Sequence, residues 1–154
     1  MVNQFRSTLR YTTYVIFAYR EASHAMLAYL DPSSASACEF DPAPFTGELR
    51  LQNDHERHPI TAIELGSGTG FVAAHIAAWL RPDLDLFFAT DLPEVCPLLE
   101  ANLRSCPAVK VRPLAWGSRE HAHALSEELG VLSADRTARY PTHILCSDLV
   151  CPRA

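Results

Sequence analysis

The stretch from Ala62 to Gly70, with the sequence AIELGSGTG, constrains the fold of this chain more than any other segment. A short apolar run ends at Leu65, and glycines follow at every second position, 66, 68 and 70. Glycine adopts backbone conformations that other residues avoid, and it lets a ligand approach the main chain directly. The segment therefore predicts a strand that ends in a tight turn, with a helix beginning behind the turn.

Strand and helix patterns alternate after this point. The short apolar runs at 60–65, 84–91, 109–116 and 142–150 predict strands. The amphipathic segments at 70–80, 93–106 and 118–129 predict helices between them, with Ser118 as a cap. Pro113 either weakens the strand at 109–116 or marks it as an edge strand. Such alternation implies an α/β fold, in which a Rossmann-like, mostly parallel sheet has helices on both faces.

The first part of the chain follows a different pattern. Residues 10–19 predict a strand, residues 20–30 a helix, and the polar, proline-rich segment 31–59 a connection. We therefore divide the chain into an N-terminal part, 1–59, and a ligand-binding Rossmann-like core, 60–154.

Composition limits the classes of partner. The net charge of −5 argues against nucleic acid, and no apolar run is long enough to span a bilayer. The five cysteines form no Cys-x-x-Cys pair, which predicts free thiols, a cytoplasmic or nuclear location and no metal site. His121 and His123 lie two positions apart on the predicted helix 118–129, and we interpret both as surface residues.

An acidic residue completes the predicted ligand site. Asp91 ends the strand that follows the glycine turn, and ligands of open α/β sheets bind at the carboxyl ends of the strands. A carboxylate at this place can accept hydrogen bonds from both hydroxyls of a ribose, which predicts a ligand that contains adenosine. NAD and S-adenosylmethionine are the two main alternatives. The usual NAD pattern, Gly-x-Gly-x-x-Gly, places its third glycine one residue later than Gly70.

Five motifs in order resemble a known family. The segments ELGSGTG, ATDLPEV, LLEANL, LAWG and ILCSDLV are similar to those of the seven-stranded (class I) S-adenosylmethionine-dependent methyltransferases. The best match is their lysine methyltransferase branch, methyltransferase family 16. The resemblance covers about residues 60–150 and extends weakly to REASHAMLAYL, 20–30.

The resemblance implies a role for each residue that matches a family motif. Those that would contact the methionine part of the cofactor are Gly66, Ser67, Gly68 and Gly70, with Glu64 beneath them. Asp91 would bind the ribose, and Leu92 and Trp116 would contact the adenine. Ser147 would also contact the cofactor, and Asp148 would serve catalysis near the transferring methyl group.

The sequence departs from the family near the substrate. An aromatic residue usually follows the catalytic aspartate after three positions, and this chain has Cys151 there. The family also has three more strands after the fourth, so we expect an incomplete sheet whose exposed edge could pair with another chain. The leading hypothesis is a truncated S-adenosylmethionine-dependent methyltransferase that acts on a lysine of a protein substrate. The alternatives are an inactive binding or regulatory module and an NAD-dependent oxidoreductase.

Overall fold

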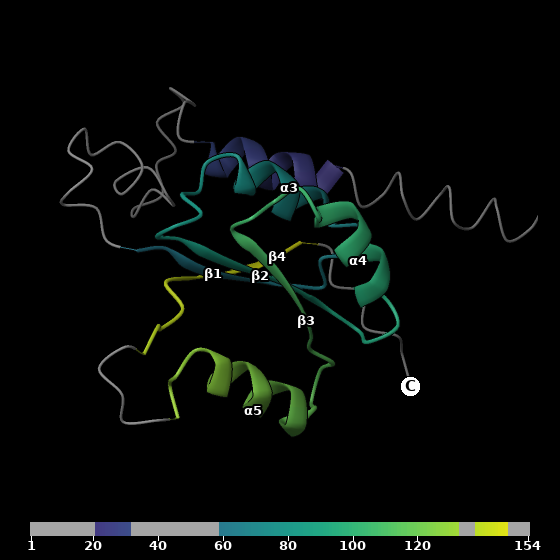
Figure 1. The fold of residues 1–154 in the computed structure, drawn as a ribbon. Coiled ribbons are helices and arrows are strands. Elements are labelled where there is room, and N and C mark those ends of the chain that lie inside the picture. Colours follow the sequence, from purple (N-terminus) through teal and green to yellow (C-terminus); the bar gives the residue numbers. More distant parts are fainter. Residues whose placement is uncertain (1–20, 32–58, 133–137, 148–154) are drawn as a thin grey trace, which may run out of the picture.

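The computed structural model describes residues 21–31, 59–132 and 138–147, and shows a parallel sheet with helices on both faces (Figure 1). The strands lie in the order β3-β2-β1-β4, and each neighbouring pair is parallel. Their bounds are β1 Thr61–Leu65, β2 Leu86–Asp91, β3 Val109–Pro113 and β4 His143–Cys146. The α/β fold with a Rossmann-like sheet is thereby confirmed.

The helices lie where the sequence predicts them, with shorter bounds. They are α3 (Phe71–Ala77), α4 (Cys96–Leu103) and α5 (Arg119–Glu128), and a further helix occupies residues 21–30. The predicted helix 70–80 ends early because the N–H groups of Trp79 and Leu80 bond to carbonyls three residues back, which tightens the last turn. Ser118 caps α5 as predicted, and its hydroxyl oxygen accepts a hydrogen bond from the His121 N–H.

Some of the predicted elements lie outside the described residues. These are the strand at 10–19, most of the connection at 31–59 and the last part of the strand at 142–150, after Ser147. The division at residue 59 therefore stays a prediction.

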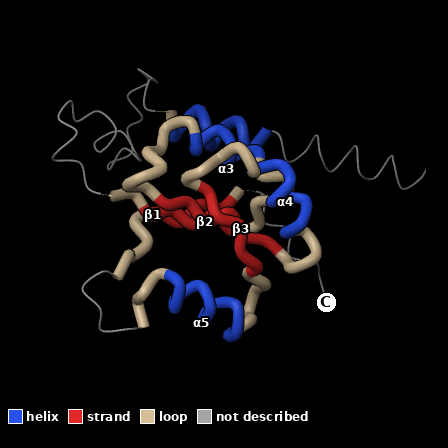
Figure 2. Tube along the Cα trace, viewed as in Figure 1, coloured by secondary structure: helices blue, strands red, loops and turns tan. Residues whose placement is uncertain are grey.

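The sheet lies between two layers of helix (Figure 2), and each face of the sheet has its own apolar cluster. The helix at 21–30, α3 and α4 lie on one face, where the strands contribute Ala62, Phe87 and Val111 to the larger cluster. The opposite face carries α5 and a smaller cluster, to which the strands contribute Ile63 and Phe88. Side chains alternate between the faces along each strand, which explains why neighbours in sequence belong to different clusters.

Helix α5 is bound to the sheet by two leucines and a charged cluster. Leu125 of the helix and Leu129, which directly follows it, are buried in the smaller cluster. Near the end of the helix, the Glu128 carboxylate accepts hydrogen bonds from the side chains of Lys110 and Arg112 on β3. These two cations lower the pKa of Glu128, although its partial burial acts in the opposite direction and raises it.

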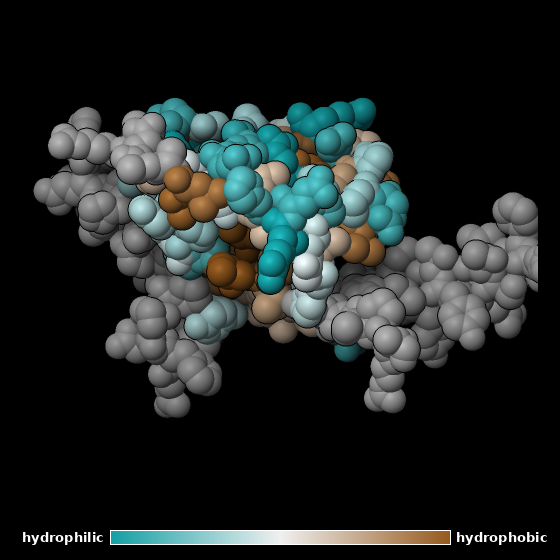
Figure 3. Space-filling model, turned by 90° about the horizontal axis from the view of Figure 1, so that it is seen from below, coloured by the Kyte–Doolittle hydropathy of each residue, from teal (hydrophilic) through white to brown (hydrophobic). Residues whose placement is uncertain are grey.

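The face that carries α5 is only partly covered at β4. Ile144 pairs in register with Ile63, so both side chains point to the same face, yet Ile144 is 64% exposed. Figure 3 views the molecule from the α5 side and shows brown apolar surface between the polar side chains. Ile144 on β4 is therefore an apolar residue exposed to solvent beside the buried strand β1.

We expect Glu128→Gln to lower the free energy of unfolding by about 1 kcal/mol at neutral pH, because the ion pairs lie at the surface. The lowered pKa means that this stabilisation is present while Glu128 is ionised and is lost as the pH falls. Urea unfolding at two pH values measures both effects. Glu127→Gln is the matched control, because the Glu127 carboxylate lies 3.6 Å from the Nδ1 of His123, an exposed residue of the same helix, α5. Equal losses for both variants would contradict an anchoring role of Glu128.

Candidate functional site

The glycine turn joins β1 to α3 in a left-handed backbone conformation. Gly68 has a φ angle of 56°, and no atom lies within 4 Å of the position that a Cβ would take. Gly70 has a φ of 80°, and a Cβ there would lie 3.0 Å from the side chain of Leu103. Gly70 thus allows close packing against α4, whereas Gly68 leaves open space in front of the main chain.

Asp91 lies beside this turn, as the sequence predicts. Its Oδ2 accepts a hydrogen bond of 2.7 Å from the Gly68 N–H, and its Oδ1 accepts one of 2.7 Å from the Leu92 N–H. A carboxylate offers about four lone-pair positions, so each oxygen keeps capacity for another donor. The two backbone bonds fix the orientation of the carboxylate and leave it able to bind a hydroxyl pair.

Glu64 lies beneath the turn and is only 1% exposed. The Ser67 hydroxyl, itself on a buried residue, donates a hydrogen bond of 2.8 Å to its Oε2. Burial raises the pKa of Glu64 from 4.5 to about 7; the Ser67 bond opposes this shift, and the charge of Asp91 adds to it. A second, buried carboxyl group therefore titrates near neutral pH next to Asp91.

Three further hydrogen bonds attach the turn to its surroundings. The Ser67 N–H donates to the Thr90 carbonyl oxygen, and the Thr90 hydroxyl donates to the Glu64 carbonyl oxygen. From α4, the Asn102 amide donates to the Thr69 carbonyl oxygen at 2.9 Å. The sequence analysis did not assign a role to Thr90 or Asn102, although Asn102 belongs to the LLEANL motif.

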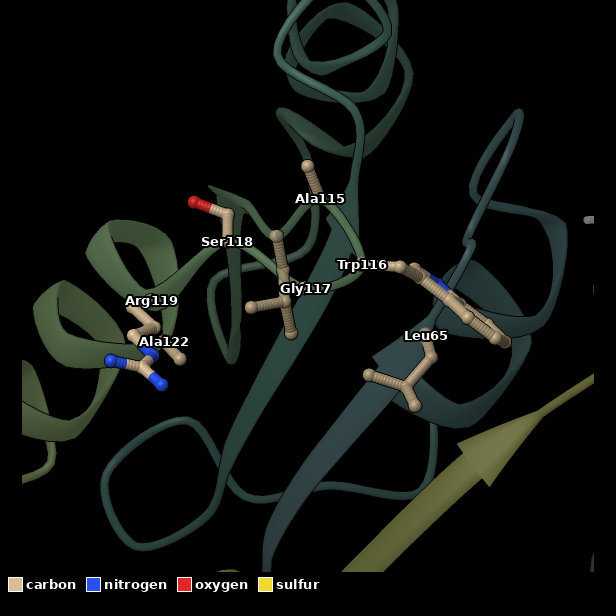
Figure 4. A pocket seen from close by; sticks show the side chains of 8 residues that line it. Leu65, Ala115, Trp116, Gly117, Ser118, Arg119 and Ala122 are labelled. Carbon is tan, nitrogen blue, oxygen red and sulfur yellow. The ribbon is translucent and has the colours of Figure 1, made fainter. Parts of the chain in front are cut away.

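An apolar cavity of about 430 Å³ lies between the end of β1 and the start of α5. The lining residues are Leu65, Leu114, Ala115, Trp116, Gly117, Ser118, Arg119 and Ala122. Figure 4 shows the Trp116 indole next to Leu65, with Arg119 and Ala122 on the other side of the cavity. Trp116 is 63% exposed, so its indole is available for contact with a ligand and does not belong to the core.

His121 contacts residues 114–118, which join β3 to α5 and are called the Trp116 turn below. Its Nδ1 lies 3.0 Å from the Ala115 N and accepts a hydrogen bond from that N–H. His121 is partly buried, and the first turn of α5 brings its ring onto the preceding loop, a contact that the interpretation as a surface residue did not include. His123, one of the exposed residues of α5, agrees with the prediction.

The remaining predicted site residues lie in different places. Leu92 follows Asp91 and is 42% exposed. Ser147 directly follows β4 and is partly buried, at the same edge of the sheet as the glycine turn. Asp148, the predicted catalytic residue, lies outside the described residues, as does Cys151.

The described residues form neither a metal cluster nor a membrane-spanning helix. Among residues 21–31, 59–132 and 138–147, no three or more His, Cys, Asp or Glu side chains gather as metal ligands would. The helices in these ranges are also too short or too polar to cross a membrane.

A comparison with protein families identifies the class of this chain. A family model described as lysine methyltransferase matches residues 17–142. The chain belongs to the lysine methyltransferase family. The match includes the glycine turn, Asp91 and the Trp116 turn, which together form the site described above.

Other comparisons give weaker likenesses. The solved structure of the selenomethionine-substituted CurJ carbon methyltransferase is similar, with 20% sequence identity and a TM-score of 0.35. The similarity covers 38% of this chain and 16% of that one. A search of curated proteins found no match. The family assignment therefore depends on the family model.

We expect Gly70→Ala to destabilise the chain by about 2–4 kcal/mol, because the new methyl group would crowd Leu103 and residue 70 has a left-handed conformation. Gly68→Ala is the control for the conformation alone and should cost about 1–2 kcal/mol, since its Cβ would meet open space. Thermal unfolding of both variants measures the difference. If Gly68→Ala were the more destabilising change, the packing role of Gly70 would be refuted.

Glu64→Gln tests the raised pKa. Folded Glu64 keeps its proton up to about pH 7, whereas the unfolded chain releases it near 4.5, so wild-type stability falls as the pH rises through this window. Glutamine has no titratable proton in this range of pH. We expect the stability of Glu64→Gln, relative to wild type, to increase by about 3 kcal/mol across the window. Denaturant unfolding at several pH values measures this, and parallel pH profiles would show that folded Glu64 titrates normally.

Proposed function

We propose that this chain binds S-adenosylmethionine at the turn between β1 and α3 and transfers its methyl group to a lysine side chain of a protein. The main support is the hydrogen bond between the Asp91 carboxylate and the Gly68 N–H, which brings an acid from one strand onto the turn after the neighbouring strand. That juxtaposition is what binding of a ribose beside a glycine turn requires.

The charges at the turn fit the cofactor. S-adenosylmethionine carries a positive ammonium and a positive sulfonium besides its one carboxylate, and the carboxyl groups at the turn belong to Glu64 and Asp91. A cation beside Glu64 would favour its ionised form and so reverse part of the effect of burial. The open space in front of Gly68 allows the methionine part to approach the main chain.

The adenine has apolar surface within reach of the same turn. Leu92 is exposed directly after Asp91, and the Trp116 indole forms one wall of the cavity. Aromatic rings bury large areas against planar ligands, so stacking on Trp116 would contribute to affinity. These features support the adenine contacts that the sequence analysis assigned to Leu92 and Trp116.

The lysine substrate rests on the description of the family. When bound, S-adenosylmethionine supplies an electrophilic methyl group, which a neutral amine can attack. A carboxylate near the amine would hold the lysine ammonium before it loses its proton, and we assign this role to Asp148. Ser147 would contact the cofactor at the end of β4. The substrate would be a cytoplasmic or nuclear protein, and the edge of β4 could pair with another chain.

Asp91→Ala tests the cofactor site. We expect it to weaken binding of S-adenosylhomocysteine by tenfold to about a hundredfold, because hydrogen bonds to a charged group are lost. Asp83→Ala removes an exposed carboxylate from the turn before β2 and serves as the control of equal charge. Isothermal titration calorimetry measures both affinities. An unchanged affinity of Asp91→Ala would refute the ribose role.

Methyl transfer is measured separately, with S-adenosylmethionine labelled in its methyl group and a cell extract as the source of protein substrates. Label on lysine residues supports the proposed reaction, and Asp91→Ala should reduce it in proportion to the loss of affinity. Binding of the cofactor without transfer to any lysine would instead favour the inactive binding module.

A further inference from the structure

The Trp116 turn depends on a contact from the helix that follows it. Most of the cavity wall belongs to residues 114–119, and the exposed Trp116 indole is not fixed by burial. The hydrogen bonds around Trp116 hold the main chain that carries the indole. The Leu114 N–H bonds to the Asp91 carbonyl oxygen at 2.7 Å, which continues the pairing of β3 with β2.

His121 provides the next attachment along this turn. Its Nδ1 accepts the hydrogen bond of the Ala115 N–H at 3.0 Å, and its own N–H bonds to the Ser118 hydroxyl oxygen at 3.3 Å. A ring nitrogen that accepts from an N–H carries no proton, so the proton of the neutral ring is on Nε2. His121 thus contacts the turn both through its ring and through its backbone.

These hydrogen bonds attach the Trp116 turn to β2 on one side and to α5 on the other. Leu114 is attached to Asp91, the last residue of β2, whose carboxylate accepts the Gly68 N–H of the glycine turn, and Ala115 is attached to α5. Trp116 comes directly after both attachments. A shift of Ala115 away from His121 would therefore move the indole relative to Leu65, which forms the neighbouring wall (Figure 4).

We propose that His121 is a positioning residue that holds the Trp116 turn in the geometry that receives the adenosyl group of the cofactor. This inference rests on the proposed function, because it assumes that Trp116 contacts the cofactor. It adds a residue outside the five motifs and makes the start of α5 part of the binding site. His121 itself contacts Ala115 and is assigned no contact with the cofactor.

The experiment compares His121→Ala with His121→Asn. Both are made in a Trp79→Phe background, so that Trp116 is the one tryptophan left of the two in the sequence. The Oδ1 of asparagine is as far from the backbone as the histidine Nδ1 and can accept the same N–H. We expect His121→Ala to weaken S-adenosylhomocysteine binding about five- to tenfold, the effect of one lost hydrogen bond. His121→Asn should stay within about twofold of the parent.

Two measurements without cofactor distinguish positioning from a loss of folding. Hydrogen exchange of the Ala115 amide should accelerate in His121→Ala and recover in His121→Asn, and acrylamide quenching of Trp116 fluorescence should follow the same pattern. His123→Ala changes an exposed histidine on the same helix and is the matched control for helix propensity. Its exchange, quenching and affinity should equal those of the parent.

Equal affinities for His121→Ala and the parent would overturn the proposal, as would a His121→Asn variant as impaired as His121→Ala. Failure of the proposed function gives a different result. In that case the parent itself would not bind S-adenosylhomocysteine, while the exchange and quenching measurements would still report whether His121 holds the turn.

Discussion

The hydrogen bond from the Gly68 N–H to the Asp91 carboxylate is the interaction on which the site depends. It joins the turn after β1 to the last residue of β2, so the parallel pairing of these two strands sets its geometry. The same carboxylate accepts from Leu92, and the Leu114 N–H bonds to the Asp91 carbonyl oxygen. One residue therefore orients the glycine turn, its own loop and the start of the Trp116 turn.

Burial of Glu64 beside this bond has an energetic cost. A carboxyl group that keeps its proton to about pH 7 loses hydration when the chain folds, and the Ser67 hydroxyl offsets only part of that loss. Apolar residues at this place would avoid the cost. Titratable groups whose pKa is shifted by burial, as that of Glu64 is, gather at functional sites. A cationic ligand at the turn, as proposed above, would offset the cost of burying Glu64 beside Asp91.

Much of this architecture could be predicted from the sequence. The alternation of strands and helices, the Ser118 cap and the proximity of Asp91 to the glycine turn follow from local pattern and from the rule that parallel strands end at one edge. The position of Pro113 on an outer strand of the described sheet follows from its missing N–H. In these cases, the residue that determines the local structure is itself part of the sequence pattern that predicts that structure.

Other features depend on residues whose partners lie elsewhere in the sequence. Asn102 bonds to Thr69 across 33 positions, and no periodicity of α4 indicates which carbonyl it reaches. His121 looks like a solvent-exposed residue because spacing along the helix gives no information about the loop before it. Helix α3 ends early in a tightened turn before Pro82. The hydrophobic pattern does not predict this end, because it continues to Leu80.

The two faces of the sheet are stabilised by different forces. The helix at 21–30, α3 and α4 cover one face mainly with apolar side chains, whereas α5 combines a small apolar contact with the charges of Lys110, Arg112 and Glu128. High ionic strength screens charges at a surface, and cooling weakens apolar burial. We therefore expect high salt to weaken the contact between α5 and β3, and cooling to weaken most the apolar contacts on the opposite face of the sheet.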